Sequence, residues 1–191
     1  MTIGFALCGS FCTYGKAFPA MEAVKDRFQN VIPIFSGASG SMDSRFGTAA
    51  GHLARAEAIC GREPILALAQ AEPIGPKKLL DALVIAPCTG NTLAKLACGI
   101  ADGPVTMAAK SHLRNGRPVL LAVSTNDGLG AAAENIGRLL ARKHIFFVPF
   151  GQDDPHGKPT SLVADFGRIV PALEQALEGI QIQPLVLGPR A

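Results

Sequence analysis

Short runs of apolar residues alternate with segments of helical periodicity along most of this chain, and this alternation limits the folds available to it. The runs are apolar at almost every position, so both of their faces should be buried. We predict strands over Ile3–Leu7, Val31–Phe35, Ala82–Ala86, Val119–Val123 and Ile145–Val148. Buried strands that are each followed by a helix are typical of a parallel sheet covered on both faces. The sequence therefore predicts an α/β fold: a three-layer, Rossmann-like domain with a doubly wound, mainly parallel sheet.

Helical spacing predicts the segments that cover this sheet. We predict helices over Tyr14–Phe28, Ala49–Cys60, Thr92–Cys98, Pro104–Leu113, Gly130–Lys143 and Val163–Leu177, with Pro171 kinking or splitting the last one. The Gly- and Ser-rich segment Ser36–Ser41 is predicted as a loop, and Pro64–Pro76 as irregular. A chain of 191 residues fits one domain, so we expect a single domain over residues 1–191 with a C-terminal tail from about residue 181.

Composition and charge argue against several classes of function. The chain is 48% apolar and only 17% charged, which favours a compact globule, and its net charge of +3 is too small to indicate nucleic-acid binding. No apolar run approaches the roughly 18–20 residues that cross a bilayer, and the N-terminus lacks a basic leader, so we expect a cytoplasmic protein. The five cysteines form no CxxC pair and have no His at ligand spacing. Free thiols and no metal site are therefore expected.

The strongest functional signal is the segment LVIAPCTGNTLAKLACGIADGPVTMAAK over residues 83–110, where an apolar strand runs directly into polar residues that open a helix. Pro87 is expected to end the strand because it has no N–H group. Thr89, Asn91 and Thr92 then offer hydroxyl and amide groups at the start of the helix. Ligands of open α/β sheets bind at this end of the strands. A well-capped turn without a ligand explains one such segment at least as well. The residues at the other strand ends therefore decide between a capped turn and a ligand site.

Three further strand ends carry similar residues. Gly9 and Ser10 follow the first strand, Ser36 follows the second, and Ser124, Thr125 and Asn126 follow the strand at 119–123. Parallel strands bring these ends to one edge of the sheet, where helix N-termini and hydroxyls bind phosphate without Lys or Arg. We therefore predict a nucleotide-like ligand. The GxGxxG fingerprint of NAD and the GxxxxGK[ST] phosphate loop are both absent. FMN fits better, because its single phosphate needs only one helix N-terminus.

Candidate substrate-binding residues are fewer. Arg45 could contact a carboxylated substrate through its guanidinium group, and Asp153 or Asp154 could lie at the rim of the site. The alternative interpretation is a surface charge for Arg45 and a solvated turn for the two Asp residues, and the solvated turn is the commoner of the two readings for Asp in a loop. None of the four histidines pairs recognisably with a carboxylate, so no catalytic acid or base is predicted.

The segment APCTGNTLAKLACGIAD resembles the APxTANTLAKxAxGxAD signature of the flavoproteins related to phosphopantothenoylcysteine decarboxylase and the flavin prenyltransferases. This resemblance implies a Rossmann-like sheet that binds FMN and a homo-oligomer, a trimer or larger. From Gly4 to about Pro184, the chain also resembles the family of bacterial dipicolinate synthase B subunits. The segments that carry this second resemblance are FALCGSFCTY, VIPIFSG, AEPIGPKKLLDALVIAPCTGN, AVSTNDGLG and FVPFGQDDPHGKPTSLVA.

The second resemblance implies a redox function in endospore formation. The chain would bind FMN and act with the NAD(P)-dependent A subunit of dipicolinate synthase to convert a hydroxy-tetrahydrodipicolinate precursor, a small dicarboxylate, to dipicolinate. The implied cofactor contacts are Gly9, Ser10 and Ser36 for the phosphate and ribityl chain, Pro87, Thr89, Asn91 and Thr92 near the ring, and Ser124, Thr125 and Asn126 to complete the pocket. Two alternatives stay open: a flavin prenyltransferase or decarboxylase-like flavoprotein, and a non-catalytic partner that stabilises the A subunit.

The chain departs from the related cysteine decarboxylases at three places. Those enzymes carry a His shortly before the APxTAN strand, where this chain has Ile74, Gly75 and Pro76. Their Pro and Met-Asn motif is replaced by residues 124–127, STND, which retain only the Asn. Gly90 replaces the usual Ala, and we expect it to leave more room beside the flavin ring. Decarboxylation of a cysteine substrate is therefore not expected.

Overall fold

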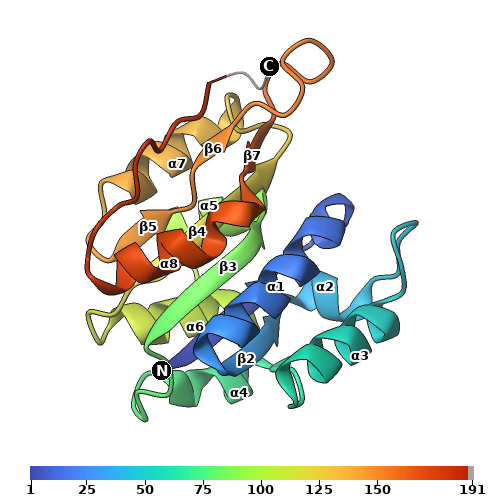
Figure 1. The fold of residues 1–191 in the computed structure, drawn as a ribbon, viewed down its shortest axis with the longest axis vertical. Coiled ribbons are helices and arrows are strands. Elements are labelled where there is room, and N and C mark those ends of the chain that lie inside the picture. Colours follow the sequence, from blue (N-terminus) through green and yellow to red (C-terminus); the bar gives the residue numbers. More distant parts are fainter. Residues whose placement is uncertain (189–191) are drawn as a thin grey trace.

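The computed structural model describes residues 1–188, and these residues contain a seven-stranded sheet (Figure 1). Its strands β1 (Thr2–Leu7), β2 (Asn30–Phe35), β3 (Ala82–Cys88), β4 (Val119–Thr125) and β5 (Ile145–Phe147) are parallel, in the order β2–β1–β3–β4–β5. Two short strands, β6 (Phe150–Gly151) and β7 (Leu162–Ala164), join antiparallel to the end of β4. The predicted parallel sheet is confirmed, and the antiparallel pair is an addition that the sequence pattern did not indicate.

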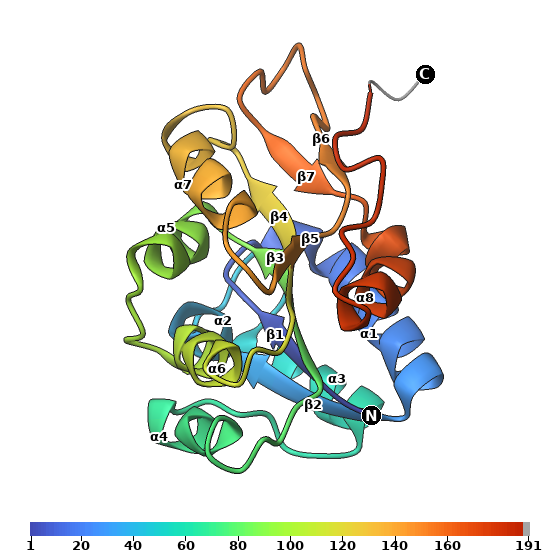
Figure 2. The ribbon, with the colours of Figure 1, turned by 90° about the vertical axis from the view of Figure 1, so that its left-hand side faces the viewer.

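Helices cover both faces of this sheet (Figure 2). One face carries α1 (Tyr14–Phe28), α3 (Ala49–Cys60) and α8 (Ile169–Leu177), and the other carries α4 (Leu68–Ala71), α5 (Gly90–Cys98), α6 (Pro104–Leu113) and α7 (Ala131–Leu140). Because both faces are covered, all seven residues of β3 are buried. This burial explains the uniformly apolar runs of the sequence, and the three-layer, Rossmann-like architecture is confirmed.

The prediction of a loop over Ser36–Ser41 is wrong, because these residues form the short helix α2 (Gly37–Ser41). Ser36 caps the helix by accepting a hydrogen bond from the Ser39 amide at 3.2 Å. The Ser39 hydroxyl in turn donates to the Leu7 carbonyl at 2.7 Å, so contact with β1 stabilises a helix that its Gly-rich sequence disfavours. A tertiary contact therefore overrides local propensity here.

The predicted helix over Val163–Leu177 is only partly correct. Its first residues form β7, a 3-10 turn η3 (Phe166–Arg168) follows, and α8 begins at Ile169. Pro171 lies in the first turn of α8, where a missing N–H costs no helical hydrogen bond, so it neither kinks nor splits the helix. Pairing with β4 and β6 draws the preceding residues into the sheet instead.

Strand β3 does not end at Pro87, as predicted, but continues through Cys88. The register between β3 and β4 shifts between Ile85 and Cys88, after which Cys88 pairs with Val123. The strand therefore accommodates its missing N–H through a local irregularity, and Pro87 lies buried inside the sheet. The polar turn that follows β3 begins at Thr89.

Two segments outside the parallel sheet complete the fold. The segment predicted as irregular, Pro64–Pro76, contains an isolated bridge from Ile65 to β2, then α4 and the 3-10 turn η2 (Glu72–Ile74). The first part of the expected tail packs on β6 through backbone hydrogen bonds of Leu185 and Leu187 with Phe150, while residues 189–191 lie outside the described residues. Among residues 1–188, no helix has the length and apolar character needed to cross a membrane.

Candidate functional site

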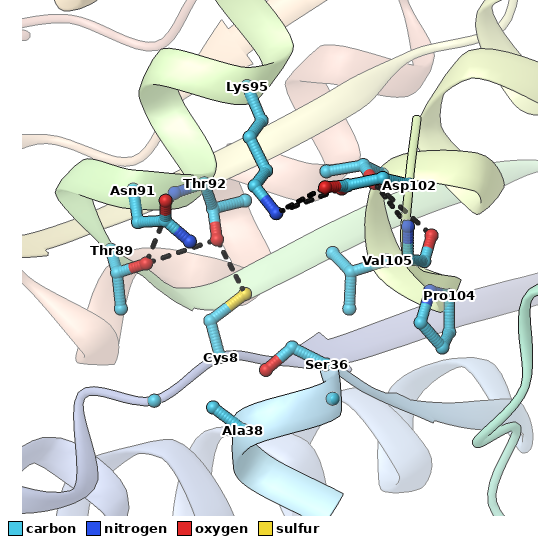
Figure 3. A pocket seen from close by; sticks show the side chains of 14 residues that line it. Cys8, Ser36, Ala38, Thr89, Asn91, Thr92, Lys95, Asp102, Pro104 and Val105 are labelled. Atoms are coloured by element: carbon cyan, nitrogen blue, oxygen red, sulfur yellow. Dashed lines mark hydrogen bonds and ion pairs between the residues drawn. The ribbon is translucent and has the colours of Figure 1, made fainter. Parts of the chain in front are cut away.

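A cleft of about 620 Å³ opens at the carboxyl edge of the parallel strands. It lies between the turns that follow β1, β2 and β3 and the start of α6 (Figure 3). Its lining residues are Cys8, Gly9, Ser36, Gly37, Ala38, Thr89, Asn91, Thr92, Lys95, Asp102, Gly103, Pro104, Val105 and Thr106. Small-molecule sites usually enclose about 300–1,000 Å³. The sheet edge singled out from the sequence therefore carries a cavity of ligand size.

The turn after β3 forms one wall of this cleft. The Thr89 hydroxyl caps α5 by accepting from the Thr92 amide at 3.2 Å, and it lies 3.1 Å from the Thr92 hydroxyl. Thr92 then donates to the Cys8 sulfur at 3.2 Å (Figure 3). These contacts tie the start of α5 to the end of β1 and fix the position of Asn91, whose exposed side chain is free to meet a ligand.

Cys8 forms part of the floor of the cleft, and sequence reasoning missed it. Burial raises the pKa of its thiol to about 11, although the hydrogen bond from Thr92 acts in the opposite direction. Cys8 is therefore a neutral thiol at pH 7 and not a thiolate nucleophile. The available signal was its position, one residue beyond the apolar run of β1 and directly before Gly9.

Three helices begin at the cleft. Ser36 is the N-cap of α2, Thr89 of α5, and Gly103 of α6, whose first residue is Pro104. The first amides of a helix have no carbonyl partner within the helix, and its dipole is positive at this end. The cleft is therefore suited to an anionic group such as a phosphate without a lysine or arginine devoted to it.

One ion pair lies in the wall between α5 and α6. Lys95 Nζ lies 2.8 Å from Asp102 Oδ2 and 2.9 Å from Oδ1 (Figure 3). The hydrogen bond from Lys95 holds the pKa of the Asp102 carboxyl below its usual value. Both residues fall within the quoted flavoprotein-like segment, but sequence analysis gave neither a role. Because each charge neutralises the other, the polarity of the cleft comes mainly from hydroxyls and helix N-termini.

The structure brings together only part of the predicted site. Gly9, Ser36, Thr89, Asn91 and Thr92 line the cleft. The predicted residues outside its lining are Ser10, Pro87, Ser124, Thr125, Asn126, Arg45 and Asp153. Ser10 directly follows Gly9, which lines the cleft, but the Ser10 hydroxyl contacts the Ser124 hydroxyl at 2.8 Å. The cleft therefore belongs to the ends of β1, β2 and β3, and the end of β4 lies outside it.

The turn after β4 is occupied by internal contacts. The buried Ser124 hydroxyl also contacts Thr13 Oγ1 at 3.5 Å, and the Thr125 hydroxyl donates to the carboxylate of Asp127. The Asn126 carbonyl accepts from the Thr160 hydroxyl at 2.7 Å. These contacts connect the end of β4 to the turn after β1 and to the loop before β7.

Gly90 allows the turn after β4 to approach α5. A Cβ atom at Gly90 would lie 2.8 Å from Thr125 Oγ1 and 2.9 Å from Asp127 Oδ1. The expectation of free space beside Gly90 is therefore wrong, because these two side chains fill it.

Arg45 and Asp153 both lie on the surface, away from the lining of the cleft. The Arg45 guanidinium lies 4.9 Å from the ring centroid of Phe46. Asp153 accepts from the Ser161 hydroxyl at 2.6 Å and lies 3.6 Å from Lys158 Nζ. These contacts match the alternative interpretation of each residue.

Comparison with known proteins agrees with the fold. Residues 1–170 match the model of the family named Flavoprotein. The chain is 46% identical over 185 residues to the B subunit of dipicolinate synthase from Bacillus subtilis (strain 168), covering 97% of this chain and 92% of that protein. The crystal structure of the B subunit of dipicolinate synthase from Bacillus halodurans has a TM-score of 0.88 and 42% identity, covering 98% of this chain and 96% of that one.

A more distant structure shares the fold alone. The FMN-dependent cysteine decarboxylase SpaF has a TM-score of 0.69 and 21% identity, covering 92% of this chain and 97% of that one. The resemblance inferred from the segment Ala86–Asp102 is confirmed by the family match, which spans the whole parallel sheet. The chain therefore belongs to the Flavoprotein family.

Proposed function

We propose that this chain is the FMN-binding B subunit of a dipicolinate synthase. It would act with an NAD(P)-dependent A subunit to convert a hydroxy-tetrahydrodipicolinate precursor to dipicolinate. The observation that carries the cofactor half is the cleft of about 620 Å³ at which three helices begin. Near full-length similarity to B subunits supports the substrate class, a small dicarboxylate, and the oxidoreductase assignment.

The cleft fits FMN in size and in the chemistry of its lining. Gly9, Ser36 and the first amides of α2 would hold the phosphate, and Thr89, Asn91 and Thr92 would contact the ring system. Ala38, Pro104 and Val105 add apolar surface that excludes water from a planar ligand. When bound, FMN supplies a reversible two-electron acceptor.

The residues that line the cleft are better suited to binding and orienting a ligand than to transferring protons. Among the residues that line the cleft, the side chains that titrate are those of Cys8, Lys95 and Asp102. Cys8 is a neutral thiol, and Lys95 and Asp102 form an ion pair. We therefore infer that the lining of the cleft offers no unpaired acid or base, so such a group would have to come from outside this lining. The same observation favours a second candidate, a non-catalytic role in stabilising the A subunit.

The proposal includes a homo-oligomer. Large apolar side chains such as Leu129, which is 53% exposed, and Val186, which is 70% exposed, are available on the isolated chain. Burial of such side chains in contacts between copies of the chain would support assembly.

Flavin titration tests the cofactor half of the proposal. The purified chain should show a flavin absorbance spectrum, or its apo form should take up FMN in a saturable manner. The Asn91→Ala variant should bind FMN more weakly, because it loses an exposed amide in the cleft. Failure of the wild-type chain to bind FMN would remove this half.

Reconstitution tests the catalytic half. The purified A subunit, NAD(P) and the precursor are mixed with and without this chain, and dipicolinate is measured. Dipicolinate should form at the full rate only when the FMN-loaded chain is present. Equal activity with an FMN-free variant would support the stabilising role, and equal activity without the chain would overturn the proposal.

A further inference from the structure

A groove of about 300 Å³ lies beside the candidate flavin cleft, between the end of α5 and α6. It is lined chiefly by Ile100, Thr106, Lys110, Leu113, Arg114 and Arg142. Thr106 also lines the cleft, so a single side chain forms part of both cavities. A molecule bound in this groove would therefore lie next to the candidate cofactor site.

The groove is cationic, and none of its lining residues is acidic. Lys110 and Arg114 are both exposed, one helical turn apart. The Arg142 guanidinium is held in place because it donates to the carbonyls of Leu96 at 3.0 Å and Ala97 at 2.8 Å. Asp102, which lies between α5 and α6 in the sequence, is paired with Lys95. The positive charge of the groove is therefore available to an outside partner.

Helix stabilisation accounts for only part of this arrangement. Lys110 lies in the last turn of α6, where a cation interacts favourably with the helix dipole. That effect does not require an apolar surface beside the cations, yet Ile100 is 46% exposed and Leu113 is partly exposed. Thr106, Lys110 and Leu113 have i, i+4, i+7 spacing and so share one face of α6. Apolar and cationic side chains on one helix face form a surface suited to an amphipathic acidic helix.

We propose that this groove is the docking surface for an acidic amphipathic helix of the A subunit. This inference rests on the proposed function, because it names the place where the second subunit docks. The ten residues of α6 span about 15 Å, so the docked helix needs about three turns. Its carboxylates would face Lys110 and Arg114, and its apolar side chains would cover Ile100 and Leu113. Docking here places the A subunit next to the cleft, where it could supply an acid or base that the described lining of the cleft does not offer.

Charge reversal tests the docking surface. Calorimetry at low and at high salt measures the affinity of the purified A subunit for the FMN-loaded chain. The wild type is compared with the double variant Lys110→Glu/Arg114→Glu. We expect affinity to fall by about tenfold or more at low salt, and the wild-type affinity to fall as salt rises. The matched control Lys16→Glu/Lys77→Glu reverses two exposed lysines outside the groove and should change affinity by less than about twofold.

Removal of the apolar contact provides a second variant. Ile100→Ser changes an exposed side chain, so the fold should persist even if the double charge reversal destabilises α6. We expect binding to the A subunit to weaken by about fivefold with little change in salt dependence. FMN uptake by the isolated chain should stay unchanged in all of these variants, because none of the substituted residues lines the cleft.

The other outcomes separate the inference from the proposed function. Wild-type binding to the A subunit with no loss in either groove variant would overturn the docking surface alone. A change in the oligomeric state of the isolated chain on charge reversal would assign the groove to a second copy of this chain and also overturn it. If the wild type does not bind the A subunit, both the docking surface and the partner half of the proposed function are overturned, whereas FMN uptake tests the cofactor half separately.

Discussion

The turn after β3 and the turn after β4 look alike in the sequence but differ in the structure. Both follow a buried apolar strand and both offer hydroxyl groups and an exposed Asn side chain. Thr89, Asn91 and Thr92 line the cleft, whereas none of residues 124–127 does. A strand end rich in polar groups therefore does not by itself identify a ligand-binding residue.

Antiparallel pairing explains the difference. The end of β4 pairs with β7, Ser124 with Val163 and Thr125 with Leu162. Because of this pairing and the hydrogen bond between the Ser124 and Ser10 hydroxyls, the turn after β4 makes its contacts inside the protein. Strand β3 pairs in parallel with β1 and β4. The turn that follows β3 leads directly into α5, which begins at the cleft. Substitutions in the two turns should accordingly have different effects.

The largest difference in FMN affinity is expected between two asparagines. Asn91→Ala should lower FMN affinity by about two- to tenfold, because a hydrogen bond to the neutral flavin ring contributes about 0.5–1.5 kcal/mol. Its melting temperature should hardly change, since the side chain is exposed. Asn126→Ala, in the exposed turn after β4, is the matched control and should leave FMN affinity unchanged. Fluorescence titration measures both, and equal losses would mean that both turns contact the flavin.

Ser124→Ala should instead lower stability. The substitution removes a hydroxyl that is 3% exposed and that contacts Ser10 at 2.8 Å. We expect the free energy of unfolding to fall by about 1–2 kcal/mol in urea denaturation, with FMN affinity nearly unchanged. Ser41→Ala, at an exposed position in α2, is the control and should cost less than about 0.5 kcal/mol. A large loss of FMN affinity without a loss of stability would reverse the roles assigned to the two turns.

Gly90→Ala tests the contact between the two turns. The added Cβ would lie within 2.9 Å of two side-chain oxygens of the β4 turn, so it must displace Thr125 and Asp127. We expect a loss of about 1 kcal/mol in unfolding free energy. In a Thr125→Ala/Asp127→Ala background the same substitution should become neutral, as a double-mutant cycle would show. An equal loss in both backgrounds would mean that the crowding arises elsewhere.

The smallest effect concerns the ion pair in the cleft wall. The pKa of Asp102 is lowered chiefly by its hydrogen bond from Lys95, so the unfolded chain binds more protons at this site than the folded chain does. Its contribution to stability is therefore present above the ordinary carboxyl pKa of 3.8 and is lost as the pH falls through the lower folded value. Thermal melts of wild type and Lys95→Met across this acid range should converge at low pH. A constant difference at every pH would exclude the ion pair as its cause.

Local sequence determined much of the fold. The parallel strands and the helices Tyr14–Phe28, Ala49–Cys60 and Pro104–Leu113 follow from apolar runs and helical spacing, and the structure has these helices with the predicted bounds. Burial on both faces leaves a strong signature in composition, and parallel topology then brings the strand ends to one edge. The existence of a ligand-sized cleft at that edge could therefore be predicted.

Tertiary structure decided which polar groups reach the cleft. The sequence around Ser124 carries no sign that β7, almost 40 residues later, will pair with it, and the Gly- and Ser-rich segment of α2 is helical because Ser39 contacts β1. The packing of α5 beside α6 likewise brings Lys95 to Asp102, and it places Ile100 in the same groove as Lys110 and Arg114. Residue type and spacing fix local structure, whereas contacts between distant segments set the direction and partner of each side chain.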